Sequence, residues 1–157
     1  MASLRDIMTY LCEHYPYKDD LSRAKLTKLV YLADWKSAID HGRQMSNIEW
    51  YFDNYGPFVW KVWDTASENP ETFEIEKSEN MFGNPKHVIR LTGRAAPASL
   101  EPEEQAVLDH VISTTKDLGW NDFIKLVYST YPVVSSERYS QLDLVKKARE
   151  YAAPPPL

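Results

Sequence analysis

The chain has 157 residues, of which 43% are hydrophobic and 26% are charged, and these proportions are typical of one folded domain with a single core. Its formal net charge of −5 argues against nucleic acid as a partner, because binding to a phosphate backbone needs a basic surface. No apolar run approaches the roughly 18 residues that span a bilayer, so we expect no membrane partner and no targeting segment. The single cysteine, Cys12, cannot form an internal disulfide, which suits a cytoplasmic protein.

The first fifty residues carry the signals of two helices. Apolar residues at helical spacing after Ser3 predict a first helix that ends at Pro16. A second helix is predicted from about residues 20–22 to His41, where Gly42 provides the C-terminal stop. The middle of this helix is apolar on nearly every side, which is typical of a helix that neighbours pack against from several directions. We therefore expect it to be the central helix of the domain.

A strand, a turn and a helix are predicted next. Residues 48–53 alternate between apolar and polar side chains, which indicates a short strand. Residues 54–57 interrupt the alternation and predict a turn. Because proline fits the first position of a helix, Pro57 is expected to begin a helix that continues over 58–66.

One hairpin and three helices are predicted in the second half of the chain. Alternating runs at 73–76 and 87–91 indicate a hairpin with a long, irregular loop. Apolar residues at helical spacing then predict helices over 102–118, 120–131 and 140–151.

Together these elements predict a mainly α (α+β) fold, a compact helical domain of about six helices with a small inserted antiparallel β-hairpin or sheet. We expect a single domain over residues 1–151. The tail over 152–157 contains three successive prolines and is expected to be flexible, because proline cannot continue a helix.

The sequence contains few patterns that indicate catalysis or cofactor binding. Its five glycines are far apart, so neither a phosphate-binding loop nor a dinucleotide fingerprint can form. The four histidines do not have the spacing of a zinc site, and we expect no metal and no cofactor. Cys12 lies among apolar residues, which is typical of a small core residue rather than a nucleophile. We therefore do not expect an enzyme; an unrecognised hydrolase would need a polar cleft that the sequence does not indicate.

Aromatic residues are concentrated between Trp50 and Trp63, where seven occur within fourteen positions. Strand alternation and helical rotation cannot turn all of them inward, so some are expected to be partly exposed. Large aromatic side chains at a surface act as anchors in protein interfaces. The alternative is that they fill the core between the sheet and the helices. The residues predicted to bind a partner are Tyr51, Tyr55, Trp60 and Trp63.

A small basic cluster precedes the apolar middle of the second predicted helix. Arg23, Lys25 and Lys28 give residues 21–33 three positive charges and no negative one. On the surface of the helix they would meet an acidic partner or a phosphate backbone. The alternative is an ordinary solvated helix face. We add Lys25 and Lys28 to the predicted partner-binding residues.

Two motifs in this sequence resemble those of a known family. The run KLTKLVYLA at residues 25–33, followed by YGP at 55–57 and a hydrophobic helix, resembles the Panacea domain, also called the SocA-like antitoxin domain. The resemblance extends over nearly the whole chain but departs from many relatives at Thr130-Tyr131-Pro132-Val133, where they carry a Thr-His pair and then Pro-Trp. The motif positions are Lys25, Lys28 and Tyr55, together with residues expected to be architectural, which are Leu29, Tyr31, Ala33, Gly56 and Pro57.

The resemblance implies a bacterial or phage toxin–antitoxin pair, in which the domain neutralises a cognate toxin protein by direct contact. It implies a cytoplasmic protein and no catalytic activity. Because one type of family member is a proteolytic adaptor, delivery of the toxin to a cytosolic AAA+ protease is an alternative function. A DNA-binding regulator of its own promoter is another, and it would have to touch phosphates through residues 23–28.

Overall fold

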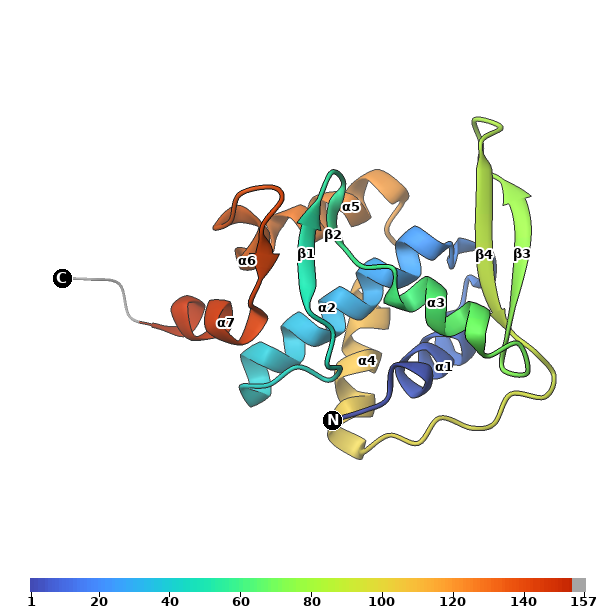
Figure 1. Ribbon diagram of the computed structural model, residues 1–157, viewed down its shortest axis with the longest axis horizontal. Coiled ribbons are helices and arrows are strands. Elements are labelled where there is room, and N and C mark those ends of the chain that lie inside the picture. The colour runs from blue at the N-terminus through green and yellow to red at the C-terminus, as the bar shows by residue number, and fades with distance from the viewer. Residues whose placement is uncertain (154–157) are drawn as a thin grey trace.

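The computed structural model describes residues 1–153 and consists mainly of helices, with a small β part (Figure 1). The predicted mainly α (α+β) fold is therefore confirmed. Within the described range the helices are α1 (Leu4–His14), α2 (Arg23–His41), α3 (Lys61–Glu68), α4 (Pro102–Thr115), α5 (Trp120–Ser129), α6 (Tyr131–Val134) and α7 (Leu144–Ala152), with a 3₁₀ turn at Lys18–Asp20. The strands are β1 (Trp50–Asp53), β2 (Gly56–Phe58), β3 (Phe73–Glu79), β4 (Pro85–Leu91) and β5 (Gln141–Leu142). Of the tail predicted to be flexible, residues 154–157 lie outside the described range.

The central helix is α2, as its apolar middle predicted. Ser22 caps its start by accepting a hydrogen bond on Oγ from the Lys25 backbone N–H at 3.2 Å, and Gly42 with φ 70° ends it. Every residue from Lys25 to Trp35 is buried. Helices α1, α3, α4 and α7 pack against α2, together with β2 and β4 (Figure 1). The core of the molecule therefore surrounds this helix.

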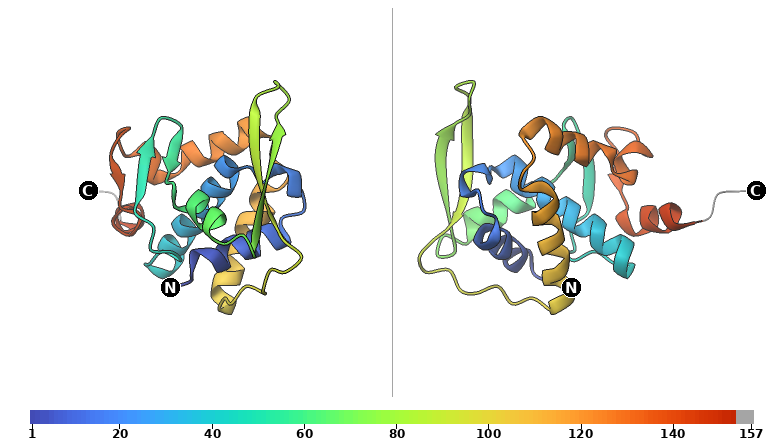
Figure 2. Two further views of the ribbon diagram at one scale, coloured as in Figure 1. Left: turned by 45° about the vertical axis from the view of Figure 1, so that its right-hand side comes forward. Right: turned by 180° about the vertical axis from the view of Figure 1, so that it is seen from behind.

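The strands form two separate antiparallel units. β1 lies in the middle of a three-stranded sheet with the order β2-β1-β5. Trp50 and Phe52 face the core from β1, while Tyr51 between them faces outward. β3 and β4 form the second, two-stranded sheet, and an isolated bridge joins Val88 on β4 to Ser22. The hairpin that β3 and β4 form projects beyond the helices at one end of the molecule (Figure 2).

Residues 56–58 form a strand rather than the start of a helix, which corrects the prediction that a helix begins at Pro57. β2 pairs with β1 in the register Asp53↔Gly56, and α3 begins only at Lys61. Proline has no N–H to contribute to a ladder, but β2 is an edge strand, where that loss is tolerated. Pro57 therefore suits both structures, and only the pairing with β1 decides between them.

The β3–β4 hairpin has longer strands and a shorter loop than predicted. β3 and β4 pair from Phe73↔Leu91 to Glu79↔Pro85, so the loop is confined to residues 80–84. Asn80 organises this loop, because its side-chain oxygen accepts hydrogen bonds from the N–H groups of Phe82 and Asn84 at 2.9 and 3.0 Å. The loop is therefore a defined turn rather than a long, irregular segment.

The C-terminal helices also differ from the prediction. The helix expected over 120–131 ends at Ser129, and a separate short helix, α6, follows it. The helix expected over 140–151 begins only at Leu144, because residues 141–142 form β5 beside β1. A strand of two residues has no measurable periodicity, so the sequence alone cannot reveal it.

We expect Gly56→Ala to lower the free energy of unfolding by about 1–2 kcal/mol, because its positive φ strains any residue with a side chain. Gly56 has φ +97°, and a Cβ there would lie 3.5 Å from the ring of Tyr128. Urea denaturation followed by circular dichroism measures the effect. Gly93→Ala is the matched control, because Gly93 has no positive φ and no neighbour within 4 Å of its Cβ position. Equal losses in the two variants would contradict the prediction.

Candidate partner-binding surface

The four predicted aromatic residues all keep exposed surface. Tyr55 at the β1–β2 turn is 81% exposed, Trp60 is 57% exposed and Tyr51 is 37% exposed. Trp63 on α3 is half-buried. The alternative that these residues only fill the core is therefore wrong, while their part in partner binding stays a prediction.

Trp60 and Trp63 both pack against the guanidinium group of Arg23. Arg23 Cζ lies 5.1 Å from the centre of the Trp60 ring and 5.0 Å from that of the Trp63 ring. Cations at this distance from an indole are attracted by the negative face of the ring. Arg23, in the first turn of α2, therefore holds the two indoles near the start of the central helix.

Further aromatic residues extend this arrangement on both sides. Phe58 on β2 meets the Trp60 ring edge-on, with the ring centres 5.2 Å apart, and His87 on β4 meets Trp63 in the same way at 5.4 Å. Tyr51 lies directly opposite Phe58 across the β1–β2 ladder and so shares its face of the sheet. We call the following residues the aromatic surface: Tyr51, Phe58, Trp60, Arg23, Trp63 and His87.

Lys25 and Lys28 are buried, which corrects the expectation that they lie on an exposed basic helix face. They are 4% and 3% exposed, because α2 is covered on all sides at this point. Lys25 Nζ lies 5.2 Å from the ring centre of Tyr15 and 5.0 Å from that of Phe123. Burial lowers the pKa of the Lys28 ammonium to about 8, although the charge of Asp53 acts in the opposite direction. These two lysines therefore do not form an exposed rim around the aromatic residues.

The motif residues expected to be architectural are all buried. The Tyr31 hydroxyl is 2.8 Å from Thr130 Oγ1, a distance that allows a hydrogen bond, and its ring meets Trp50 edge-on with the centres 5.5 Å apart. Tyr31 thus connects α2 to β1 and to the end of α5. Burial fits an architectural role for the complete set: Leu29, Tyr31, Ala33, Gly56 and Pro57.

A buried carboxylate on α2, Asp34, fixes the position of β1, and sequence reasoning missed it. Asp34 accepts hydrogen bonds from the Ser46 N–H at 2.9 Å, from Ser46 Oγ at 2.5 Å and from Trp50 Nε1 at 2.9 Å. Trp50 is the first residue of β1, so these bonds set where the β1–β2 hairpin and its exposed tyrosines lie. The sequence feature that could have indicated this role is the position of Asp34, a single acidic residue at the end of the apolar run in α2.

We expect the stability of the wild-type protein to fall, relative to that of Asp34→Asn, as pH rises from 4.5 to 7.5. Burial raises the pKa of the Asp34 carboxyl from 3.8 to about 6, against the effect of hydrogen bonds from Ser46 and Trp50. Between these two values the folded state binds more protons than the unfolded state, so raising the pH disfavours folding. The difference amounts to about 2 kcal/mol over this range. Urea midpoints of both proteins at the two pH values measure it, and a constant difference would contradict the prediction.

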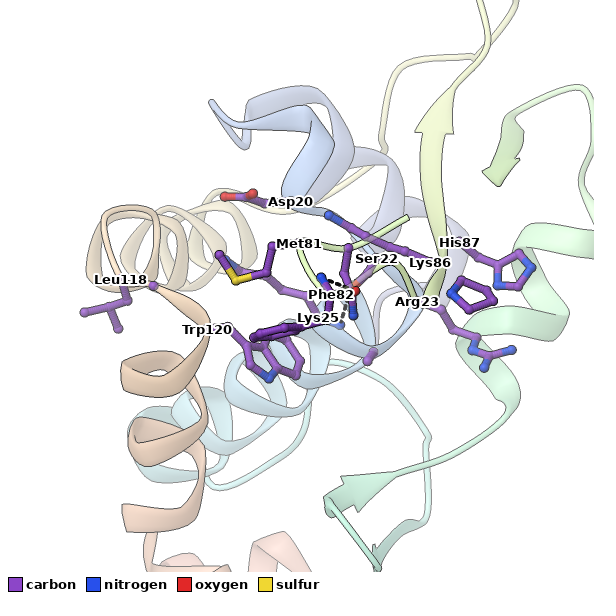
Figure 3. Close-up of a pocket in the computed structure, with 14 residues that line it drawn as sticks. Asp20, Ser22, Arg23, Lys25, Met81, Phe82, Lys86, His87, Leu118 and Trp120 are labelled. Carbon is purple, nitrogen blue, oxygen red and sulfur yellow. Dashed lines mark hydrogen bonds between the residues drawn. The ribbon is translucent and has the colours of Figure 1, made fainter. Parts of the chain in front are cut away.

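A cavity of about 450 Å³ opens beside the aromatic surface (Figure 3). It is lined by the first turn of α2, the β3–β4 hairpin and the junction between α4 and α5. Its apolar lining includes Met81 and Phe82, which are 89% and 80% exposed, and Trp120, which is 49% exposed. The sequence prediction missed these residues, although an apolar pair among the turn residues of 80–84 was the available signal.

Neither a metal-binding cluster nor a membrane-spanning helix is found within residues 1–153. Within residues 1–153, no cluster of histidine, cysteine, aspartate or glutamate is arranged to hold a metal ion. No helix in that range has the length and apolar character needed to cross a membrane. Cys12 is buried, and burial raises the pKa of its thiol to about 12, so it is a protonated core residue.

Comparison with protein families finds a match to the domain described as "Antitoxin SocA-like, Panacea domain", over residues 26–132. The match contains most of α2, the β1–β2 turn and the helices as far as α5, so it is shorter than the near-complete resemblance that the motifs implied. No curated protein and no solved structure matches the chain. The matched family is antitoxin-like and not typically enzymatic. Because the match covers well over half of its residues, this chain belongs to the SocA-like Panacea antitoxin family.

Proposed function

We propose that this protein neutralises a cognate toxin by direct contact and that the aromatic surface is the face that binds it. The observation that carries the proposal is the packing of Trp60 and Trp63 against Arg23 at a surface where Trp60 stays 57% exposed. Tryptophan, tyrosine and arginine are the residue types that contribute most to protein interfaces. Membership of an antitoxin family makes a toxin the expected partner.

The fixed positions of these side chains also support binding. Trp60 and Trp63 are held by contacts to three different elements, through Phe58 on β2, Arg23 on α2 and His87 on β4. Side chains already ordered in the free protein lose little conformational entropy when a partner binds. The aromatic surface is therefore preorganised for an interface.

The burial of Lys25 and Lys28 weakens the alternative of a DNA-binding regulator. A DNA backbone carries a row of phosphates and needs several cations along an open surface, whereas these two residues are only 4% and 3% exposed. Of the basic cluster, Arg23 alone is not buried, and its guanidinium is engaged with two indoles. No observation within residues 1–153 favours DNA over a protein partner.

Co-expression with the product of the neighbouring open reading frame tests the proposal. That product should arrest growth alone, and this protein should restore growth, copurify with it and leave its amount unchanged. Rescue accompanied by protease-dependent loss of the toxin would instead support the adaptor function. Growth arrest without rescue or copurification would overturn both functions for that pair.

A further inference from the structure

The cavity beside the aromatic surface gathers positive charge in a chain whose formal net charge is −5. Arg23 and Lys25 contribute from α2, and Lys86 contributes from β4. None of these three side chains forms an ion pair with any residue from 1 to 153. Asp20 is exposed and is the only acidic residue of the described chain among those that line the cavity. We call this site the basic cavity.

The first turn of α2 adds to this positive potential. The N-terminus of a helix carries a partial positive charge, which an acidic residue in the first turn usually compensates. α2 has no acidic residue in its first turn and carries Arg23 and Lys25 there instead. An anion bound in the basic cavity would compensate both the helix end and these cations.

Lys25 provides an independent indication of a ligand. Lys25 is 4% exposed, and its Nζ forms no hydrogen bond or ion pair with any residue from 1 to 153. The Nζ lies near the ring faces of Tyr15 and Phe123. The nitrogen is not fully enclosed, and Lys25 is one of the residues that line the basic cavity. A buried ammonium without an acceptor leaves strong hydrogen-bonding capacity unused.

The walls of the basic cavity identify the kind of anion. In Figure 3, Lys25 and Phe82 lie near the middle of the group, with Leu118 and Trp120 on one side and Arg23 on the other. Phe82 and Trp120 are exposed aromatic side chains and would be covered by apolar groups of a ligand. A carboxylate next to an apolar side chain, as in a polypeptide, satisfies both the cations and the walls. The volume of about 450 Å³ is in the range of ordinary ligand sites.

We propose that the basic cavity binds an acidic segment of the toxin, with an aspartate or glutamate carboxylate against Lys25 and a neighbouring apolar side chain against Phe82 and Trp120. The identity of the partner rests on the proposed function. Lys25 is then the residue that selects a carboxylate over a neutral side chain. The basic cavity and the aromatic surface share Arg23 and His87, so one partner can cover both.

Two short peptides test the selection of a carboxylate without any toxin. Acetyl-Phe-Glu-Phe-amide and acetyl-Phe-Gln-Phe-amide differ only in charge and are titrated into the ¹⁵N-labelled full chain by NMR. The glutamate peptide should bind at least about tenfold more tightly, because hydrogen bonds to ionised groups are the stronger ones. Equal affinities would overturn the proposal. So would inorganic phosphate that displaces the glutamate peptide at equal concentration, because the basic cavity would then be a site for small anions.

Variants assign the selectivity to Lys25. Lys25→Met removes the ammonium group but keeps an unbranched side chain as far as Cε, and it should reduce the difference between the two peptides to less than twofold. Lys146→Met, at an exposed position on α7, is the matched control and should keep the full difference. If Lys25→Met does not fold, as judged by circular dichroism, Lys86→Gln at the half-buried β4 position should lower the selectivity about threefold. If Lys25→Met and Lys86→Gln fold and still show the full difference in affinity between the two peptides, the proposal is overturned.

A double-mutant cycle then identifies the toxin as the occupant. Each acidic residue of the toxin found by rescue is changed to the corresponding amide, and binding is measured against wild type and Lys25→Met. At least one toxin variant should bind the wild-type antitoxin about tenfold more weakly than the unchanged toxin does. The same toxin variant should bind Lys25→Met as well as the unchanged toxin does. If the peptides show selectivity but no toxin residue is coupled to Lys25, the toxin is not the occupant of the basic cavity. Failure of the peptide test alone would leave neutralisation through the aromatic surface standing.

Discussion

Trp60→Ala is expected to weaken binding of the cognate toxin by about 2 kcal/mol, or roughly 30-fold, while the fold persists. Trp60 is the more exposed of the two indoles that contact Arg23, so a partner can bury a large part of its ring. It stands at the N-cap position of α3 but makes no side-chain capping bond there. The substitution should therefore remove an interface anchor without removing a capping interaction. Isothermal titration calorimetry with purified toxin measures the loss, and urea denaturation checks the fold.

Tyr151→Ala on α7 is the control for this binding experiment. Tyr151 is 58% exposed, which matches Trp60, but it belongs to a different face, where its ring meets Trp35 and Tyr131. We expect toxin binding by this variant to be unchanged. If Trp60→Ala and the corresponding alanine variants of Tyr51 and Trp63 all retained full toxin binding, the aromatic surface would be excluded as the interface.

Asp34→Ala is expected to lower the free energy of unfolding by about 3 kcal/mol at neutral pH, because it leaves buried donors without an acceptor. The substitution removes the partner of the Ser46 N–H and hydroxyl groups and of Trp50 Nε1, all in buried residues. Loss of the charged carboxylate relieves part of its desolvation, but the cavity and the unpaired donors outweigh that relief. Urea denaturation followed by tryptophan fluorescence measures the change.

Asp40→Ala on the same helix is the matched control. Asp40 is exposed, and its carboxylate forms an i,i+4 ion pair with Lys36 at 3.1 Å. Pairs of this kind stabilise a helix by about 0.3–0.5 kcal/mol, so the control should change stability by no more than that. A loss at Asp34 as small as that at Asp40 would show that the buried hydrogen bonds do not hold β1 in place.

Helices were predictable because their signals are local. Ser22 caps α2 at the later end of the predicted start range of 20–22, and Gly42 ends the helix where predicted. The apolar middle of that helix identifies it as central. The start of β2 was not predictable in the same way, because the geometry of Pro57 fits either the first turn of a helix or an edge strand. Pairing with β1, rather than propensity, decides that position.

The sequence predicted the candidate site only where strand or helix periodicity determines which side chains are exposed. The seven aromatic residues within fourteen positions had to leave some rings at the surface, and Trp60 is one of them. The burial of Lys25 depends on Tyr15 and Phe123, which lie outside the helix and far apart in the sequence. The basic cavity likewise needs the loop over 80–84 to meet the start of α5. Local sequence patterns do not predict such contacts between distant segments.

The projecting β3–β4 hairpin has a consequence for how partner choice can change. Its loop over 80–84 contributes Met81 and Phe82 to the basic cavity, yet these side chains are 89% and 80% exposed and stand outside the hydrophobic core. Surface substitutions of this kind usually alter stability by less than about 0.5 kcal/mol. If the basic cavity binds a partner as proposed, substitutions in this loop would change specificity while α2 and its packing remain constant.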